Sequence, residues 1–326
     1  MKLPLIAVLL AASTAFAAEK TPPPKAYLTP EEAGPDFQIQ GEYEGTLNAA
    51  KVGAQVIAMG KGSFRVVVFR GGLPGEPDSR KSPREVEAQK QGDSVTFTNN
   101  ANTITVGGGK AICKGNGQEF ELQRVVRKSP TEGAKAPEGA IALFDGTNVD
   151  AWKSAAKMND AKLLEALSNP TTKQEFKDFT LHVEFLLPFM PDARGQGRAN
   201  SGVYLQGRYE VQVLDSFGLK GEDNECGGIY RNAAPLVNMC YPPLQWQTYD
   251  VDFTAAKFGA DGNKTANAVV TIKLNGIVIH DKLELKGPTP GGPKSGGNEN
   301  SPGPLYLQGH GNPVMYRNIW IVEKGK

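Results

Sequence analysis

Residues 200–216, NSGVYLQGRYEVQVLDS, alternate apolar side chains with side chains that could do chemistry. Successive side chains of a β-strand point to opposite faces, so the apolar parity predicts a buried face made by Val203, Leu205, Val211 and Val213. The other parity carries amides, a phenol and a carboxylate: Asn200, Tyr204, Gln206, Glu210 and Gln212. Neutral donors and acceptors together with an aromatic ring could bind the hydroxyl groups and the ring of a sugar.

Two further segments repeat this pattern. In TLHVEF, His182 and Glu184 alternate with apolar residues. In LYLQGH, the polar residues at alternate positions are Tyr306, Gln308 and His310. Polar alternation on one strand is typical of a solvated face, and a lone His or Glu there could simply have a local partner. The joint pattern on three strands favours one site. If these strands are neighbours in one sheet, we expect Glu184, Glu210 and His310 to point into one cleft.

Length and composition limit the possible classes of protein. The chain has 326 residues, enough for one large or two modest domains, and a net charge of about +1. This balance gives no reason to expect nucleic acid or an anionic membrane as a partner. The 38 Gly and 23 Pro indicate many turns and favour an all-β fold. The Gly-rich stretch ECGGIYRNAAP lacks the spacing of a phosphate-binding loop.

The first residues read as a targeting segment. Lys2, a short apolar run and the sequence Ala15-Phe16-Ala17 predict a signal peptide over residues 1–17, too short for a spanning helix. Residues 18–36, rich in Pro and charge, predict an extended leader. We therefore expect an exported protein, periplasmic or secreted, with no membrane span.

Three cysteines follow in the rest of the chain. In an oxidising compartment Cys226 and Cys240 could form a disulfide, and the alternative is two buried thiols. We expect the disulfide. Cys113 is then left as a small buried strand residue. No second Cys or His pair gives the spacing of a zinc site.

Two β-rich units are separated by a linker. Short β-rich runs with Gly and Asn turns predict a small β-domain over residues 37–127, and residues 128–139 have the composition of a linker. Alternating strands over residues 140–326 predict a β-sandwich. The one predicted helix is NDAKLLEALSNP, residues 159–170, with a cap at Asn159 or Asp160 and Pro170 at its end.

Seven sequence blocks of the second unit, in order, resemble the 3-keto-disaccharide hydrolase domain family over about residues 139–323. They are ALFDGTNVDAWK, FTLHVEF, NSGVYLQGRYEVQVLDS, CGGIYRNAAPLVN, WQTYDVDF, LNGIVIHD and GPLYLQGHGNPVMYRNIWI. The resemblance implies a concanavalin-A-like jelly roll, related to laminin-G sandwiches, and an activity that cleaves 3-keto-glycosides. One block departs from the family: a strand usually precedes the stretch KQEFKDF, and the helix predicted at 159–170 stands in its place.

The implied reaction assigns roles to the polar residues of these strands. A ketone at C3 makes the C2 proton acidic, so a base can remove it, the glycosidic oxygen can leave from C1 by β-elimination, and water can then add. Such a site needs a base, a donor to the C3 oxygen and an acid. The candidates for acid and base are Glu210, His310, Glu184 and His182. The amides Asn200, Gln206, Gln212 and Gln308 would hold hydroxyls, and Tyr204 or Tyr306 would stack on the ring or donate to the enolate.

Two alternatives stay open, and no cofactor is predicted. Glu184 and Glu210 could act as the two carboxylates of an ordinary glycosidase, about 5 Å apart for retention or about 6.5–9.5 Å apart for inversion. The sandwich could also be a carbohydrate-binding module without chemistry. Glu, His and Gln can ligate a divalent metal, but their spacing here is not diagnostic of one.

Overall fold

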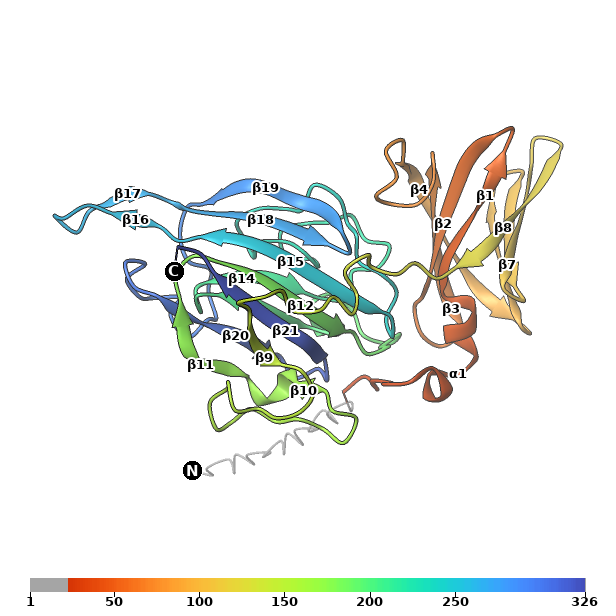
Figure 1. The fold of residues 1–326 in the computed structure, drawn as a ribbon. Helices are drawn as coiled ribbons and strands as arrows, with labels where there is room; N and C mark the ends of the chain where they lie inside the picture. The colour runs from red at the N-terminus through yellow and green to blue at the C-terminus, as the bar shows by residue number, and fades with distance from the viewer. Residues whose placement is uncertain (1–22, 326) are drawn as a thin grey trace, which may run out of the picture.

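The computed structural model describes residues 23–325, which form a closed β-barrel followed by a β-sandwich of two sheets (Figure 1). The pairs of neighbouring strands in both units are antiparallel, so the prediction of an all-β protein is confirmed. The predicted signal peptide lies outside the described residues. Among the described helices, none is long and apolar enough to cross a membrane.

The barrel is built from eight strands that pair in chain order, with β1 closing onto β8. The strands are β1 Gly41–Leu47, β2 Ala50–Ala58, β3 Ser63–Arg70, β4 Arg80–Gln91, β5 Ser94–Asn99, β6 Asn102–Gly107, β7 Lys110–Gly115 and β8 Gln118–Val125. Alternate residues point inward, and Tyr43, Phe64 and Phe97 are buried in the interior. A barrel of eight strands is narrow enough for such side chains to fill it.

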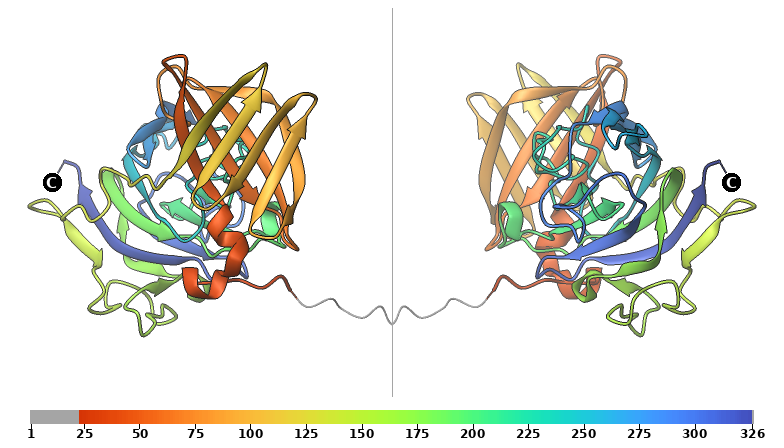
Figure 2. Two further views of the ribbon diagram at one scale, coloured as in Figure 1. Left: turned by 90° about the vertical axis from the view of Figure 1, so that its right-hand side faces the viewer. Right: turned by 90° about the vertical axis from the view of Figure 1, so that its left-hand side faces the viewer.

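A helix covers one end of the barrel, where an extended leader was predicted. Helix α1 Pro30–Ile39 begins after Thr29, whose hydroxyl accepts a hydrogen bond from the Glu32 amide, and Pro30 suits the first helical position. Gly34 interrupts the helix with φ 73°. The prediction of an extended segment up to residue 36 is therefore wrong from Pro30 onward. In both views of Figure 2, α1 lies at the lower end of the barrel.

The sandwich consists of a larger and a smaller sheet. The larger has the order β10-β21-β12-β15-β18-β19, with β9 also paired to β21, and the smaller has the order β11-β20-β13-β14. The strands of the larger sheet are β9 Ile141–Phe144, β10 Leu164–Glu165, β12 Phe179–Leu186, β15 Trp246–Thr254, β18 Ala268–Leu274, β19 Ile277–Leu285 and β21 Met315–Glu323. Those of the smaller are β11 Thr171–Phe176, β13 Ser201–Leu205, β14 Tyr209–Val213 and β20 Gly303–Gly309, and β16 Lys257–Phe258 pairs with β17 Lys264–Ala266 as a separate hairpin.

One hydrophobic core joins the two sheets. Leu181 and Val183 of the larger sheet and Val203, Leu205 and Val211 of the smaller sheet belong to the same buried cluster. The apolar parity of each strand therefore faces the other sheet, and the polar parity of each strand faces outward from the sandwich.

Residues 159–170 are not a helix. They form the short strand β10 and the single turn η1 Ala166–Ser168, and β10 pairs with β21. The Asn159 side chain accepts a hydrogen bond from the Leu163 amide and stabilises a tight turn, in which Lys162 has φ 62°. Leu164 and Ala166 are both buried, which is the period of a strand rather than a helix. A short strand is thus present at the point where the family pattern has one.

Barrel and sandwich are in direct contact through residues 189–198. Phe189 is buried in the barrel core, and its backbone forms an antiparallel bridge with Tyr27. The Arg198 guanidinium binds the Asp215 carboxylate (Nε–Oδ2 2.6 Å) and donates to the Ala58 carbonyl of β2 at 3.3 Å. The segment that leads into β13 is therefore fixed to the barrel.

Candidate functional site

A cavity of about 260 Å³ lies on the outer face of the smaller sheet. Strands β13, β14 and β20 supply its floor, and the loops 190–200, 224–234 and 286–302 supply its walls. The lining residues are Gln196, Asn200, Tyr204, Glu210, Gln212, Tyr230, Arg231, Pro290, Gly291, Gln308 and His310.

Glu210 is the only carboxylate among these lining residues. Its side chain is 3% exposed, and burial raises its pKa to about 7, against the lowering effect of a hydrogen bond from Tyr204. Gly202 on the neighbouring strand leaves room for it, because a Cβ there would lie 2.4 Å from Glu210 Oε1. A carboxyl group with a pKa near neutrality can both take and return a proton.

The Tyr204 hydroxyl has one proton and two acceptors. Its oxygen is 2.7 Å from Glu210 Oε2 and 2.8 Å from the Pro290 carbonyl, and Gln308 Nε2 donates to it at 3.2 Å. When Glu210 is ionised, Tyr204 donates to it. When Glu210 is protonated, the carboxyl can donate to Tyr204, which then donates to Pro290. Both protonation states of Glu210 are therefore hydrogen-bonded.

A group of amides lines the wall beside Glu210. Gln196 Oε1 accepts from Asn200 Nδ2 and from Gln212 Nε2, both at 3.1 Å. Gln196 Nε2 donates to the Asn224 carbonyl at 2.8 Å. The three side chains hold one another in place, as a site for neutral hydroxyl groups requires.

Two basic side chains, Arg231 and His310, also line the cavity. Arg231 is exposed, has φ 58° and lies over the Tyr230 ring at 5.3 Å from the centroid. Within residues 23–325 it has no carboxylate partner. His310 is exposed at the end of β20. A guanidinium group and an imidazole are thus available to a charge that develops on a bound molecule.

Six of the predicted residues line this cavity: Asn200, Tyr204, Glu210, Gln212, Gln308 and His310. Gln206 does not, because the strand ends at Leu205; Gln206 adopts φ 54° in the hairpin turn, and its amide donates to the Phe176 carbonyl. Tyr306 lies on the outer face beside Tyr204, and its hydroxyl donates to Asn169 outside the cavity.

His182 and Glu184 are elsewhere. Both lie on β12 of the larger sheet, with side chains on its outer face, so they are on the opposite side of the sandwich from Glu210. The expectation that Glu184, Glu210 and His310 share one cleft is wrong for Glu184. The same placement excludes Glu184 and Glu210 as the paired carboxylates of a glycosidase, because the core of the sandwich separates them.

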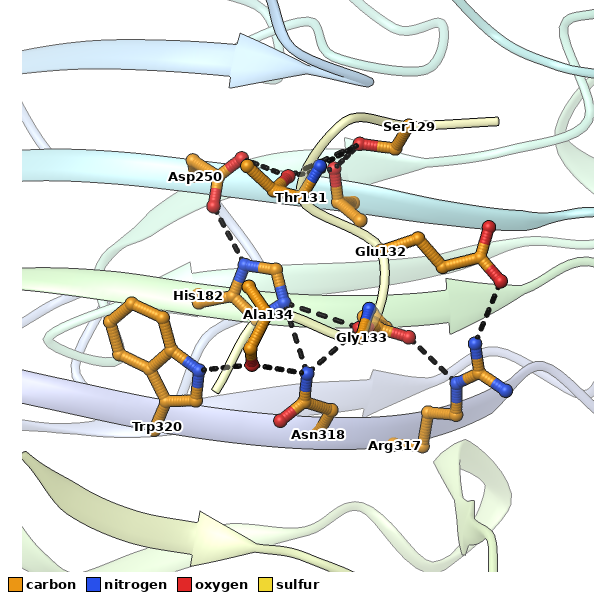
Figure 3. A network of polar contacts seen from close by, with 12 residues as sticks. Ser129, Thr131, Glu132, Gly133, Ala134, His182, Asp250, Arg317, Asn318 and Trp320 are labelled. Carbon is orange, nitrogen blue, oxygen red and sulfur yellow. Dashed lines mark hydrogen bonds and ion pairs between the residues drawn. The ribbon is translucent and has the colours of Figure 1, made fainter. Parts of the chain in front are cut away.

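The predicted linker covers His182 and Glu184. Residues 129–134, hereafter the strap, cross the outer face of the larger sheet (Figure 3). The Gly133 amide donates to Glu184 Oε1 at 2.5 Å, and the Ala134 carbonyl accepts from Asn318 at 2.9 Å. Thr131 donates to Asp250 at 2.6 Å. The strap is therefore an ordered part of the sandwich.

The groups beneath the strap form an ionic network. Arg317 Nε is 2.6 Å from Glu184 Oε2, and His182 Nδ1 is 2.6 Å from Asp250 Oδ1. Burial opposes ionisation of Glu184, but hydrogen bonds from His182, Asn318, Gly133 and Arg317 outweigh it and lower its pKa to about 2. For His182 burial acts to lower the pKa, and the bonds to Asp250 and Glu184 raise it overall. These groups are paired with one another, which is what a structural network requires.

Cys226 and Cys240 are free thiols in the structure, so the expected disulfide is absent. Both are buried in the sandwich core, as the alternative interpretation had it. Cys226 Sγ lies 3.3 Å from the Tyr249 hydroxyl, and Cys240 Sγ lies 3.5 Å from the carbonyls of Leu214 and Tyr241. Cys113 is buried on β7, as predicted.

No metal cluster accompanies the cavity. Within the part of the chain that the structure describes, no three His, Cys, Asp or Glu side chains come together in a way that could hold an ion.

Five lining residues were missed from the sequence: Gln196, Tyr230, Arg231, Pro290 and Gly291. Gln196 lies in the single 3-10 turn η2 Gly195–Gly197 and the other four lie on loops, where the alternation of a strand gives no information. The one available signal is the block CGGIYRNAAPLVN, which contains Tyr230 and Arg231 and is part of the family resemblance, although nothing in it assigns a role to either residue.

The family of the chain follows from comparison with known proteins. The model of the 3-keto-alpha-glucoside-1,2-lyase-like domain matches residues 139–322, more than half of the chain. None of the curated proteins matches the chain in sequence.

One solved structure is similar to this chain. It is that of a "putative glycosyl hydrolase" from Parabacteroides distasonis ATCC 8503, with 35% identity and a TM-score of 0.52 over 58% of this chain and 85% of that chain. A second structure with the same description and organism has 18% identity and a TM-score of 0.39, over 61% and 98% of the two chains. The second unit is thus a glycosidase-type domain, and the chain belongs to the 3-keto-alpha-glucoside-1,2-lyase-like domain family.

Proposed function

We propose that the protein cleaves 3-keto-glycosides in the Glu210 cavity, by elimination across C1 and C2 followed by addition of water. The observation that carries this proposal is the single buried carboxylate, with its pKa near 7, among amides, phenols and a guanidinium group. Ordinary glycosidases use two carboxylates, whereas the removal of an acidic C2 proton needs one base.

The steps can be assigned to named side chains. Ionised Glu210 takes the C2 proton, and the electron pair moves to the C3 oxygen as an enolate. Arg231 is placed to stabilise that oxygen, because it is the one lining side chain with a fixed positive charge. The enolate then collapses to a C1–C2 double bond, and the glycosidic oxygen leaves with a proton from His310. Addition of water across the double bond gives the free 3-keto sugar, so the net reaction is hydrolysis.

The remaining side chains orient the substrate. Gln196, Asn200 and Gln212 form a preassembled wall of amides for sugar hydroxyls. Tyr204 holds Glu210 in either protonation state. His182 and Glu184 take no part, because they lie on the far side of the sandwich.

We also propose that the protein is exported and that its sandwich is a jelly roll. The N-terminal sequence supports export through a cleaved signal peptide, to the periplasm or the medium. The two packed antiparallel sheets support a jelly roll of the concanavalin-A type.

A cleavage assay with a 3-keto-disaccharide and its unoxidised parent tests the proposal. We expect cleavage of the oxidised sugar alone, and a loss of about 10²- to 10⁴-fold in Glu210→Gln. Glu222→Gln, which removes an exposed carboxylate paired with Lys220, is the control and should keep full activity. Equal cleavage of the parent sugar would contradict the elimination, and binding without cleavage would identify a binding module.

A further inference from the structure

The barrel has a second cavity, at the end opposite helix α1. Its volume is about 470 Å³, and it opens where β3 ends and where the turns β1–β2, β5–β6 and β7–β8 lie. This end is uppermost in Figure 1, where β1 points toward it. The cavity is formed by the barrel alone and is independent of the Glu210 site.

The two ends of the barrel interior are filled differently. Near α1 the interior holds Phe64, and Phe189 of the sandwich closes it. Near the open end the inward position at the start of β2 is Ala50, whose methyl side chain leaves space. Four apolar side chains around that space are only partly buried: Val52, Val68, Ile104 and Phe120. An eight-stranded barrel can hold one small ligand, and an apolar concave site of this size is typical of such binding.

One cation faces the same space. Arg70 continues the inward parity of Phe64, Val66 and Val68 at the last residue of β3. Two lysines at the rim are neutralised, Lys51 by Glu76 and Lys114 by Glu119. For Arg70, in contrast, the described residues offer no carboxylate partner. Its guanidinium group is therefore free to bind an anion from solution.

We propose that the open end of the barrel binds a small amphipathic anion, such as a medium-chain carboxylate. The apolar part lies against Val52, Val68, Ile104 and Phe120, and the head group binds Arg70. The apolar lining binds the alkyl chain of the ligand by removing it from water, and the guanidinium group distinguishes an acid from the corresponding alcohol.

Calorimetric titration of the full-length protein with decanoate and with decan-1-ol, below the concentrations at which either aggregates, tests this site. We expect one decanoate per chain and binding of the alcohol that is about tenfold weaker. Arg70→Gln should weaken decanoate about tenfold and leave the alcohol unchanged. Lys61→Gln, which removes a charge at the closed end, is the matched control and should bind both ligands as the wild type does.

Ala50→Phe gives an independent test, since it fills the cavity without removing a contact. We expect it to abolish binding of both ligands, with cleavage activity in the Glu210 cavity unchanged. The proposal is overturned if the wild type binds neither ligand, if Arg70→Gln binds decanoate normally, or if Ala50→Phe has no effect.

Discussion

Glu210 has one property that strand alternation cannot show, which is the burial that raises its pKa to about 7. Alternation did identify which face of its strand it occupies, and the same test selected five further residues that line the cavity: Asn200, Tyr204, Gln212, Gln308 and His310. It failed for His182 and Glu184, because parity tells on which side of its own strand a residue lies but not to which sheet the strand belongs. It failed for Gln206 because the strand ends one residue earlier.

The raised pKa predicts a stability effect of Glu210→Gln. The folded carboxyl keeps its proton up to about pH 7 and the unfolded one only to 4.5, so unfolding releases a proton between these values. The wild type therefore loses stability as the pH rises through this window. We expect Glu210→Gln to be more stable than wild type at pH 8, by about 3 kcal/mol, and by less than about 1 kcal/mol at pH 4.5.

Urea unfolding followed by tryptophan fluorescence measures this difference. The three tryptophans, Trp152, Trp246 and Trp320, all lie in the sandwich, so the signal reports the unit that contains Glu210. A variant that is less stable than wild type at pH 8 would show that the buried, ionised carboxylate does not destabilise the wild type.

At the scale of the elements, the composition of a segment is a poor guide to whether it has a defined structure. The strap reads as a linker because it is rich in Gly, Pro and charge, yet its backbone is bound by Glu184 and Asn318. The partners come from β12 and β21, far away in the sequence, so no local pattern reveals them. Residues 159–170 show the same limit, since an apparent helix becomes a strand through its pairing with β21.

Glu184→Gln should release the strap. The change leaves Arg317 and His182 without their shared anion, and breaking a buried ionic network costs about 3 kcal/mol. We expect faster hydrogen exchange of amides 129–134 and lower stability of the sandwich above about pH 4.5. The difference should diminish toward pH 2, because Glu184 is then protonated in the wild type as well.

Asp252→Asn is the control for this measurement, since that carboxylate lies on neighbouring β15 and its side chain is 58% exposed. It should change the stability by no more than about 0.5 kcal/mol. Slow exchange of the strap in Glu184→Gln would mean that the network does not hold it.

At the scale of the whole molecule, the barrel contacts a segment that lines the cavity of the sandwich. Arg198, which is 6% exposed, connects Asp215 at the end of β14 with the Ala58 carbonyl of the barrel. Two residues before and after it are Gln196 and Asn200, which line the cavity. The sequence predicted two units and a boundary between them, but this contact depends on tertiary packing and was not predictable.

Arg198→Gln should therefore affect substrate binding more than chemistry. Loss of a buried charged hydrogen bond that orients Gln196 and Asn200 should raise KM for a 3-keto-disaccharide about tenfold. The pH dependence of kcat, which reports Glu210, should be unchanged. The exposed Lys220→Gln is the control, and an unchanged KM in Arg198→Gln would show that the barrel does not position the loop.

The central claim is that Glu210 removes the C2 proton, and the fate of that hydrogen tests it most directly. A 3-keto-disaccharide deuterated at C2 is cleaved in ordinary water, and the 3-keto sugar product is analysed by mass spectrometry. Elimination predicts that solvent hydrogen appears at C2 of the product. Full retention of the deuterium, after correction for spontaneous exchange beside the ketone, would contradict the elimination and indicate direct displacement at C1.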